Sequence, residues 1–246
     1  MCYHKSLTAK YEQLVAYYST TYSELVEELY SVKFHENGFD FLPGPVVTAG
    51  RPSEIQMFHW GLVPFWVKDG AAATRLKTST LNCISEEMYE KPSFRDAAKE
   101  GKRCLIPCTG FFEWRWMDEK GKAKIPYYIY LKNQPIFSIA GLYSRWVDRS
   151  ADQRYYSYTV LTTKANPMMG TIHNSKFRMP VILPREYEKD WLNPDLTKDD
   201  VLALCQPIDD SLMTAHTISK RITSKNEETN VPEVLNVANY EELNSK

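Results

Sequence analysis

The sequence lacks the features of membrane and exported proteins. No apolar run in its 246 residues approaches the roughly 20 residues that a membrane-spanning helix needs. The N-terminus has neither the basic region nor the apolar stretch of a signal peptide, so the cytoplasm is the expected location, with no membrane partner. The 30 Lys and Arg residues are cancelled by 31 Asp and Glu residues. A net charge of −1 gives no global attraction to nucleic acid, so DNA binding would require a local basic groove.

Cysteine is scarce, and its spacing argues against disulfides and zinc. The chain has five cysteines, with no C-x-x-C pair and no matching histidine cluster: Cys2, Cys83, Cys104, Cys108 and Cys205. Disulfide frameworks and zinc sites normally show paired cysteines at short spacing. We therefore expect reduced thiols, no metal and no other cofactor.

Enough apolar residues are present for a buried core, since 43% are hydrophobic and 13% are aromatic. Apolar residues at helical spacing between residues 11 and 30 predict one amphipathic helix or two. The segment 91–102 predicts a shorter helix, because proline suits a first turn and Gly101 suits a stop. A Thr-x-x-Asp capping signal at Thr197 predicts the start of a late helix.

The middle of the chain predicts a sheet. Short runs rich in β-branched and aromatic residues follow one another between turn residues, namely RCLIP, GFFEWRW, IPYYIYL, PIFSIAGLY and YYSYTVLTT. MTAHTIS predicts one more strand before a polar tail. No repeat, linker or boundary is visible. We expect one α+β domain over residues 1–246, mostly antiparallel.

Two segments carry residues suited to proton transfer. Glu113 lies in CLIPCTGFFEW, where burial would raise the pKa of its carboxyl and suit a general acid or base. Strand alternation also permits an exposed glutamate, which this segment alone favours. His173 lies in GTIHNSKFRMPVIL, and histidine is the side chain best placed to move protons near neutral pH. A lone histidine is nevertheless more often structural. Lys176 and Arg178 nearby could contact phosphate, although such basic pairs are usually solvated.

Polar and aromatic residues in other segments have functional and ordinary interpretations. The amide of Asn82 could orient a reacting group through a donor and an acceptor, or belong to an ordinary turn. Cys83 beside it is interpreted as a small buried residue. Of the six tryptophans, most belong to the core, but some could stack on unpaired bases. Trp114, which directly follows Glu113, is favoured for that role.

Cys2 is unusual in its position. Removal of Met1 would leave Cys2 with a free α-amine and a thiol on adjacent carbons, which is a 1,2-aminothiol. An α-amine has a pKa of roughly 7.7 to 8.0, so a useful fraction is unprotonated at neutral pH, whereas lysine titrates near 10.4. Most cysteines near a terminus have no such role, so this position needs support from the remaining sequence.

Taken together, these segments resemble the SOS response-associated peptidase (SRAP) family, whose members shield abasic sites in single-stranded DNA. The matching motifs, in chain order, are MC, WGLVPFW, LNCISEE, KPSFR, RCLIPCTGFFEW, PYYIY, AGLY, LTTKAN, IH and RMPVIL. They run from Cys2 to about Trp191, and HTIS at residues 216–219 resembles the family's last strand. Each motif is weak alone, but their order is highly specific.

The resemblance implies a fold and a set of functional residues. It implies a single compact domain with a barrel-like β core, peripheral helices and a positively lined groove for single-stranded DNA with abasic sites. The implied catalytic residues are Cys2 as the nucleophile, Asn82, Glu113 and His173. The expected DNA contacts are Trp66, Trp114, Thr162, Lys176 and Arg178. We expect a monomer that is associated with the nucleoid when bound to DNA.

The chain departs from the family pattern at three places. The family usually begins Met-Cys-Gly-Arg, whereas Tyr3 and His4 follow Cys2 here, so an arginine that contacts phosphate is missing beside the nucleophile. Ile84 stands where the asparagine motif usually has an arginine. Four residues separate His173 from Arg178 where the family commonly has one, which lengthens this loop.

The resulting hypothesis is covalent capture of an abasic site. The α-amine of Cys2 would form a Schiff base with the sugar aldehyde, and the thiol would close a thiazolidine ring, which leaves a DNA–protein crosslink. The same Schiff base would permit weak lyase activity by β-elimination. Two other classes stay open at this point: a cysteine-dependent peptidase, acting on its own leader, and a non-covalent binder of single-stranded or modified DNA.

Overall fold

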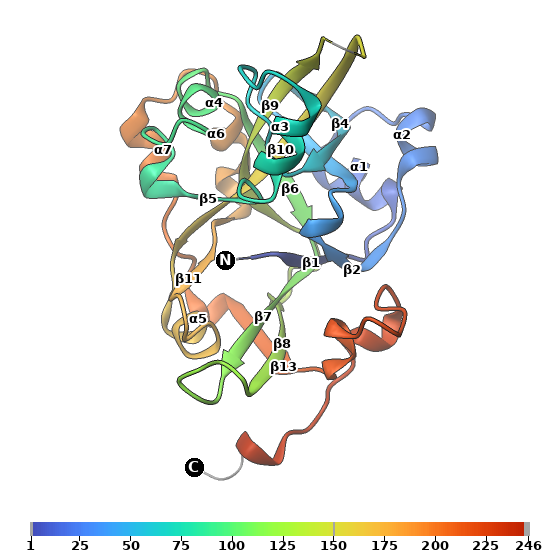
Figure 1. The fold of residues 1–246 in the computed structure, drawn as a ribbon, viewed down its shortest axis with the longest axis vertical. Coiled ribbons are helices and arrows are strands. Elements are labelled where there is room, and N and C mark those ends of the chain that lie inside the picture. Colours follow the sequence, from blue (N-terminus) through green and yellow to red (C-terminus); the bar gives the residue numbers. More distant parts are fainter. Residues whose placement is uncertain (1, 150, 244–246) are drawn as a thin grey trace.

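Two β-sheets share the centre of the molecule, and short helices lie around them (Figure 1). The computed structural model describes residues 2–149 and 151–243. The expected α+β class is confirmed, and so is the predominance of antiparallel pairing. In this described part, no helix is long and apolar enough to cross a membrane.

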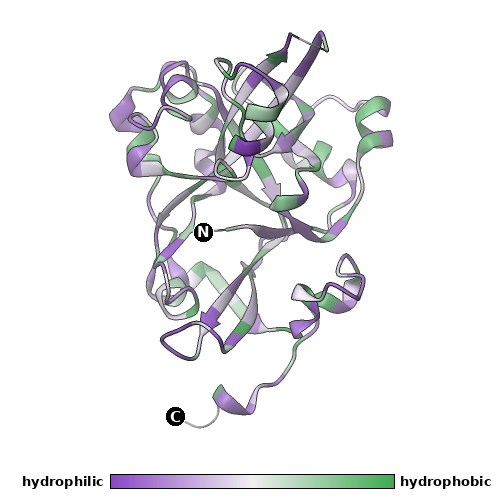
Figure 2. Cartoon of the chain, in the orientation of Figure 1, coloured by the Kyte–Doolittle hydropathy of each residue, from purple (hydrophilic) through white to green (hydrophobic). Residues whose placement is uncertain are grey.

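The first strand of the chain belongs to a five-stranded sheet. Its order is β13–β8–β7–β1–β2. The strands are β1 (His4–Leu7), β2 (Lys33–Asn37), β7 (Gly110–Trp116), β8 (Lys124–Leu131) and β13 (Met213–Thr217). Because β1 pairs with both β2 and β7, the N-terminus enters the middle of the molecule (Figure 1). β1 is drawn as hydrophilic in Figure 2, although Lys5 and Ser6 are fully buried.

The second sheet contains the barrel-like core. Its order is β11–β10–β4–β3–β6–β9–β12, with β5 beside β10. The strands are β3 (Pro43–Thr48), β4 (Arg51–Trp60), β5 (Asn82–Ile84), β6 (Arg103–Cys108), β9 (Phe137–Asp148), β10 (Gln153–Lys164), β11 (Arg178–Pro180) and β12 (Ile182–Leu183). Because β9 also pairs with β10, the strands β10, β4, β3, β6 and β9 form a closed ring, as the resemblance implied. β10 runs parallel to β4 and β5 and antiparallel to its other neighbours.

The helices follow the capping signals of the sequence. Two helices occupy the region 11–30, α1 (Tyr11–Tyr18) and α2 (Glu24–Leu29), because Ser19 turns into the left-handed conformation with φ 53° and ends α1. Thr197 and its N3 residue form the expected capping box of α7 (Lys198–Leu204). The other helices are α3 (Gly70–Lys77), α4 (Arg95–Lys99), α5 (Pro167–Ile172) and α6 (Glu188–Leu192). Helix α3 was not predicted, because its alanine-rich first turns lack an apolar stripe; the helix starts at an Asp69 N-cap.

The expected polar tail does not extend freely into solvent. After β13 the chain turns back, and Ile218 forms a bridge with Val237 while Thr217 bonds Ala238. Between Ile218 and Val237, the side chain of Asn230 accepts hydrogen bonds from backbone N–H groups of β2. The C-terminal segment, defined as residues 218–240, thus covers exposed edges at both sides of the five-stranded sheet, where unpaired backbone groups would otherwise remain.

Candidate active site

Cys2 lies in the protein interior, two residues before β1. Its side chain is completely buried, and its thiol faces the backbone oxygen of His4 at 3.6 Å. Burial raises the pKa of the thiol well above its ordinary value, and the nearby Glu113 raises it further. The four other cysteines are also buried and unpaired, as expected for reduced thiols.

Glu113 lies on the neighbouring strand β7, and its side chain is buried. Phe112 and Trp114 pack in the cluster beneath the C-terminal segment, whereas Phe111 packs in the central core with Cys2. Because side chains alternate along a strand, Glu113 points inward on the same face of β7 as Phe111. Burial raises the pKa of Glu113 to about 7, although the backbone N–H of Trp114 partly opposes that shift. The exposed glutamate favoured from its segment alone is therefore wrong, because that face of β7 is the inner one.

His173 completes an acid–base pair with Glu113. Asn166 caps α5 and Pro167 opens it, and the helix ends at His173. The Nε2 atom of His173 lies 3.7 Å from Oε2 of Glu113. The Nδ1 atom lies 2.7 Å from the carbonyl oxygen of Arg178. Since a carbonyl only accepts, Nδ1 carries the proton in the neutral ring, and the Nε2 lone pair faces the carboxyl.

The protonation states of this pair suit proton exchange. Burial lowers the pKa of His173 to about 4, so the ring is neutral near pH 7. The carboxyl of Glu113, with a pKa of about 7, is half protonated there. A protonated carboxyl facing an imidazole lone pair can pass its proton to an adjacent group and recover it, which is the requirement for general acid–base catalysis.

Asn82 begins β5, which pairs in parallel with β10 at Val160. Its side chain is buried, yet neither its amide nitrogen nor its amide oxygen has a hydrogen-bond partner among the described residues. Such an unsatisfied buried amide is rare in folded proteins and costs about 1–3 kcal/mol for each group. An ordinary turn asparagine would not be buried in this way, so the geometry favours a role in holding a ligand or a reacting group.

Arg178 and Thr162, two of the expected DNA contacts, are joined by a tight ion-pair network. The Arg178 guanidinium lies 2.7 and 2.8 Å from the two carboxylate oxygens of Glu86, and it also donates to the carbonyl of Thr162. Hydrogen bonds from Arg178 lower the pKa of Glu86 to about 2. Glu86 was not among the predicted site residues, although the acidic pair in LNCISEE was a visible signal. Lys176 is exposed in the loop before β11.

The two tryptophans expected to contact DNA lie in different surroundings. Trp114 is partly buried, and its ring meets the edge of His4 at a centroid distance of 4.9 Å. Trp66 is 45% exposed in the loop between β4 and α3. It borders a hollow of about 610 Å³ that is also lined by Lys68, Arg145 and Arg149. No recorded hydrogen bond or ring contact among the described residues joins Trp66 to the catalytic candidates.

The fold and the candidate site together indicate the class to which this protein belongs. The chain is an α+β protein with a closed strand ring, a cysteine at the start of the chain and a buried glutamate–histidine pair beside it. In the described ranges, no three His, Cys, Asp or Glu side chains converge as metal ligands. The family model for the SOS response associated peptidase (SRAP) matches residues 1–225, and the chain belongs to this family.

Curated relatives and solved structures agree with this assignment. The chain is 39% identical over 191 residues to the abasic site processing protein YoqW of Bacillus subtilis, covering 77% of this chain and 80% of that protein. It is 31% identical over 200 residues to the abasic site processing protein HMCES of Xenopus tropicalis, covering 74% of this chain and 56% of that protein. A crystal structure of a Bacteroides thetaiotaomicron protein superposes with a TM-score of 0.89 at 38% identity, covering 96% and 100% of the two chains.

Proposed function

We propose that this protein processes abasic sites in single-stranded DNA by forming a covalent crosslink through Cys2 after removal of Met1. The observation that carries the proposal is the placement of Cys2 beside the buried Glu113–His173 pair. The names of YoqW and HMCES, both abasic site processing proteins, support the substrate. Met1 lies outside the described residues, and the proposal requires its removal.

The chemistry follows from the two nucleophiles of an N-terminal cysteine. The abasic sugar opens to an aldehyde, the α-amine adds to the carbonyl carbon, and loss of one water gives an imine. The thiol sulfur then attacks the imine carbon while its proton moves to the nitrogen, which closes a five-membered thiazolidine ring. No oxidant or reductant is consumed. Elimination of the 3′ phosphate from the same imine would account for a weak lyase activity.

The surrounding side chains divide the proton transfers between them. His173, neutral with its Nε2 lone pair facing Glu113, assists the opening of the sugar ring. Glu113 delivers a proton to the leaving hydroxyl and removes one from the amine, for which a pKa of about 7 is suitable. The unsatisfied amide of Asn82 positions the terminal residue or the sugar by donating and accepting at once.

The electrostatics of Cys2 favour crosslinking over general peptidase activity. A cysteine peptidase attacks as a thiolate and lowers the pKa of its cysteine with a neighbouring positive charge. Here burial and Glu113 raise the pKa of the Cys2 thiol. In the crosslinking reaction the amine attacks first, and a neutral thiol can transfer its proton to the imine nitrogen as it adds, so a raised thiol pKa is compatible with the mechanism.

We expect DNA to contact exposed and partly exposed residues outside the buried catalytic candidates. Lys176 is free to contact phosphate, and Trp114 and Trp66 offer rings on which bases could stack. Glu86 neutralises the charge of Arg178. We therefore expect Arg178 to support the site by holding Thr162 with its guanidinium and His173 with its backbone carbonyl.

The test is intact-mass measurement after incubation with a single-stranded oligonucleotide that contains one abasic site. The native protein should have lost Met1 and should gain the mass of the oligonucleotide less one water. Cys2→Ala should form no stable adduct. Cys2→Ala and Cys2→Ser both keep the amine but lack the thiol, so each should form a lasting adduct only after borohydride reduction of the imine. Cys108→Ala, which removes another buried thiol, is the matched control and should crosslink normally.

Two results would contradict the proposal. Equal crosslinking by Cys2→Ala without reduction would show that the adduct does not depend on ring closure by the Cys2 thiol. Efficient cleavage of an unrelated peptide, lost in Cys2→Ala, would favour the peptidase reading, and equal, purely reversible binding of intact and abasic oligonucleotides would favour a non-covalent binder.

A further inference from the structure

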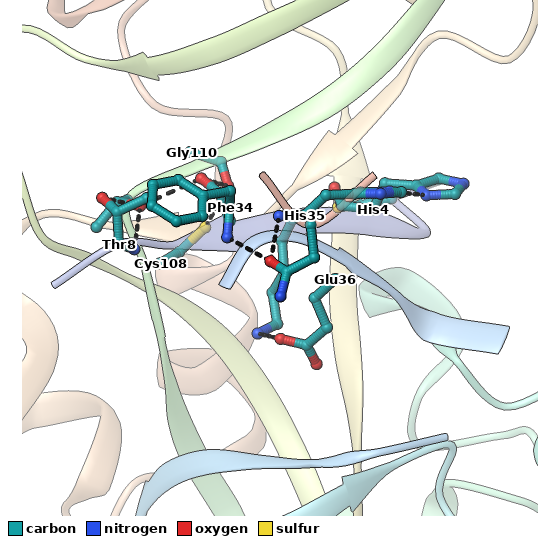
Figure 3. A network of polar contacts seen from close by, with 12 residues as sticks. His4, Thr8, Phe34, His35, Glu36, Cys108 and Gly110 are labelled. Atoms are coloured by element: carbon teal, nitrogen blue, oxygen red, sulfur yellow. Dashed lines mark hydrogen bonds and ion pairs between the residues drawn. The ribbon is translucent and has the colours of Figure 1, made fainter. Parts of the chain in front are cut away.

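Cys2, Glu113 and His173 belong to three separate parts of the fold. Strand β1, which follows Cys2, pairs with β2 and is held to it by the buried ion pair between Lys5 and Glu36 (Figure 3). Glu113 lies within β7, which pairs with β8 along one edge. His173 lies on no strand, because it ends α5 and opens the loop that leads to β11. Its distance from Glu113 therefore depends on how this loop is attached to β7.

The side chain of Asn174 attaches this loop, defined as residues 174–177, to the end of β7. Its Oδ1 atom accepts the backbone N–H of Trp116 at 2.9 Å, and its Nδ2 atom donates to the carbonyl oxygen of Trp116, also at 2.9 Å. Asn174 directly follows His173, and Trp116 ends the strand that carries Glu113. The two hydrogen bonds thus join the neighbour of one catalytic candidate to the strand of the other.

These bonds use backbone groups of Trp116 that would otherwise have no strand partner. Trp116 lies opposite Lys124 of β8 on one edge of β7. On the other edge, the recorded pairing with β1 lies at Gly110 and Phe111 and does not reach Trp116. An asparagine amide offers both a donor and an acceptor, so it can satisfy an N–H and a C=O of the same residue. Asn174 therefore takes the place of a paired strand residue.

The end of β7 to which Asn174 binds is itself well ordered. In the turn to β8, the carboxylate of Asp118 accepts three backbone N–H groups. The ammonium of Lys124 lies 5.0 Å from the ring centroid of Trp116. A Cβ atom at Gly121 would lie 2.7 Å from the same ring, so the ring packs directly on the glycine backbone. The loop is thus attached to a fixed part of the sheet.

The other recorded backbone bonds of the loop lead elsewhere. The carbonyl of His173 accepts the N–H of Phe177 at 2.9 Å, and the carbonyl of Phe177 accepts the N–H of Ala165 at 2.9 Å. Phe177 has a φ of 53°, a left-handed conformation that is uncommon for residues other than glycine. These contacts connect the loop to itself and to the end of β10. The amide of Asn174 supplies the attachment to β7.

We propose that Asn174 is a positioning residue for the reaction, which holds the imidazole of His173 against Glu113 by attaching the loop to β7. The proposal rests on the proposed function, because it concerns how the same acid–base pair is held in place. The contact that depends on it is the 3.7 Å approach of Nε2 of His173 to Oε2 of Glu113. Groups that exchange protons must come within hydrogen-bond reach, so a displacement of the loop by about 1 Å would slow the reaction.

The experiment measures single-turnover crosslinking, with the full-length protein in excess over an oligonucleotide that contains one abasic site. Asn174→Ala should lower the maximal rate about tenfold, which is the change that two ordinary hydrogen bonds together produce. The protein concentration at half the maximal rate should stay the same, because Asn174 does not hold the DNA. Ser175→Ala is the matched control in the same loop. Its side chain is also partly exposed and has no recorded hydrogen bond among the described residues, so this variant should react at the native rate.

A double-mutant cycle tests whether Asn174 acts through His173. His173→Ala removes the imidazole and should slow crosslinking by about a hundredfold or more. Asn174→Ala should then cause no further loss, because the group that it positions is already absent.

Asn174→Asp tests the pattern of the two hydrogen bonds. An ionised carboxylate accepts the N–H of Trp116 but cannot donate to its carbonyl, whereas a protonated carboxyl does both. The ratio of the variant's rate to the native rate should therefore rise as the pH falls from about 7 towards the usual aspartate pKa of roughly 3.9.

An NMR titration of the His173 ring gives a measurement that needs no DNA. Burial lowers the pKa of His173 to about 4. In Asn174→Ala the detached loop would admit water to the ring, so this pKa should rise towards its ordinary value of 6.5. Glu113 and Lys176, which place charges near the ring, are retained in this variant. A rise in the pKa would therefore report reduced burial of the ring.

A native maximal rate in Asn174→Ala would overturn the proposal. An equal loss when Asn174→Ala is added to His173→Ala would also overturn it, since the effect would then not involve the imidazole. So would an unchanged pKa of His173 in Asn174→Ala. Failure of the proposed function is seen separately, as absence of an adduct with the native protein, and the NMR titration would still show whether Asn174 holds His173 in place.

Discussion

Glu113→Gln should stabilise the folded protein in a manner that depends on pH. The pKa of Glu113 is raised to about 7 from an ordinary value of 4.5, so ionisation of this carboxyl opposes folding. Below pH 4.5 the carboxyl is protonated in both the folded and the unfolded chain and costs no stability. As the pH rises from 4.5 towards 7, the free energy of unfolding falls, because only the unfolded chain ionises readily. Above pH 7 the loss is constant, because both folded and unfolded chains are then ionised.

The magnitude follows from the two pKa values. The penalty on the native protein is roughly 1 kcal/mol at pH 5 and about 3 kcal/mol at pH 8, because each pKa unit corresponds to about 1.4 kcal/mol. Glutamine does not ionise, so the stability of the variant relative to the native protein should improve by about 2 kcal/mol between these pH values. Any cost of burying the glutamine amide is the same at both and cancels.

The assay is urea unfolding of both proteins at pH 5 and pH 8, with free energies from linear extrapolation. Glu119→Gln, at an exposed turn, is the matched control and should show no such difference. An equal change in the free energy of unfolding at both pH values for Glu113→Gln would refute the reasoning. It would mean that the carboxyl of Glu113 titrates in the folded protein as it does in the unfolded chain. The same variant should lose crosslinking activity, which is the stability–activity trade-off expected of a catalytic acid.

Two further predictions concern ion pairs. Lys5→Met leaves Glu36 buried without its partner and should cost about 3–5 kcal/mol in the free energy of unfolding, whereas Lys5→Met with Glu36→Leu should recover most of the loss. Urea unfolding measures both, and equal stability of the single and double variants would contradict the assignment. Glu86→Gln removes the carboxylate from Arg178, so binding to an intact oligonucleotide should strengthen and its salt slope should steepen by about 0.7. Glu87→Gln is the neighbouring control, and an unchanged slope in Glu86→Gln would show that Arg178 does not reach phosphate.

The elements of the fold were largely predictable, because local patterns specify them. Alternation in GFFEWRW and YYSYTVLTT predicted β7 and β10, and the Thr197 capping signal predicted α7. Helix α3 was missed, since its stability depends on an N-cap and on packing rather than on an apolar stripe. The course of the C-terminal segment was also missed, because polar residues such as Asn230 bind backbone groups that no local pattern reveals.

The sequence by itself determined which chemical groups the protein has and in what order they occur. The thiol of Cys2, the carboxyl of Glu113 and the imidazole of His173 were identifiable from motifs, because a motif is read from a few neighbouring residues. The burial and protonation states of these groups depend on the tertiary structure. The Glu113–His173 contact, the Arg178–Glu86 ion pair and the His35–Thr229 bond join residues that are far apart in the chain, the last two by 92 and 194 positions. Burial, the pKa of about 7 at Glu113 and the tautomer of His173 arise from those contacts, because desolvation and hydrogen bonding depend on what surrounds a group in space.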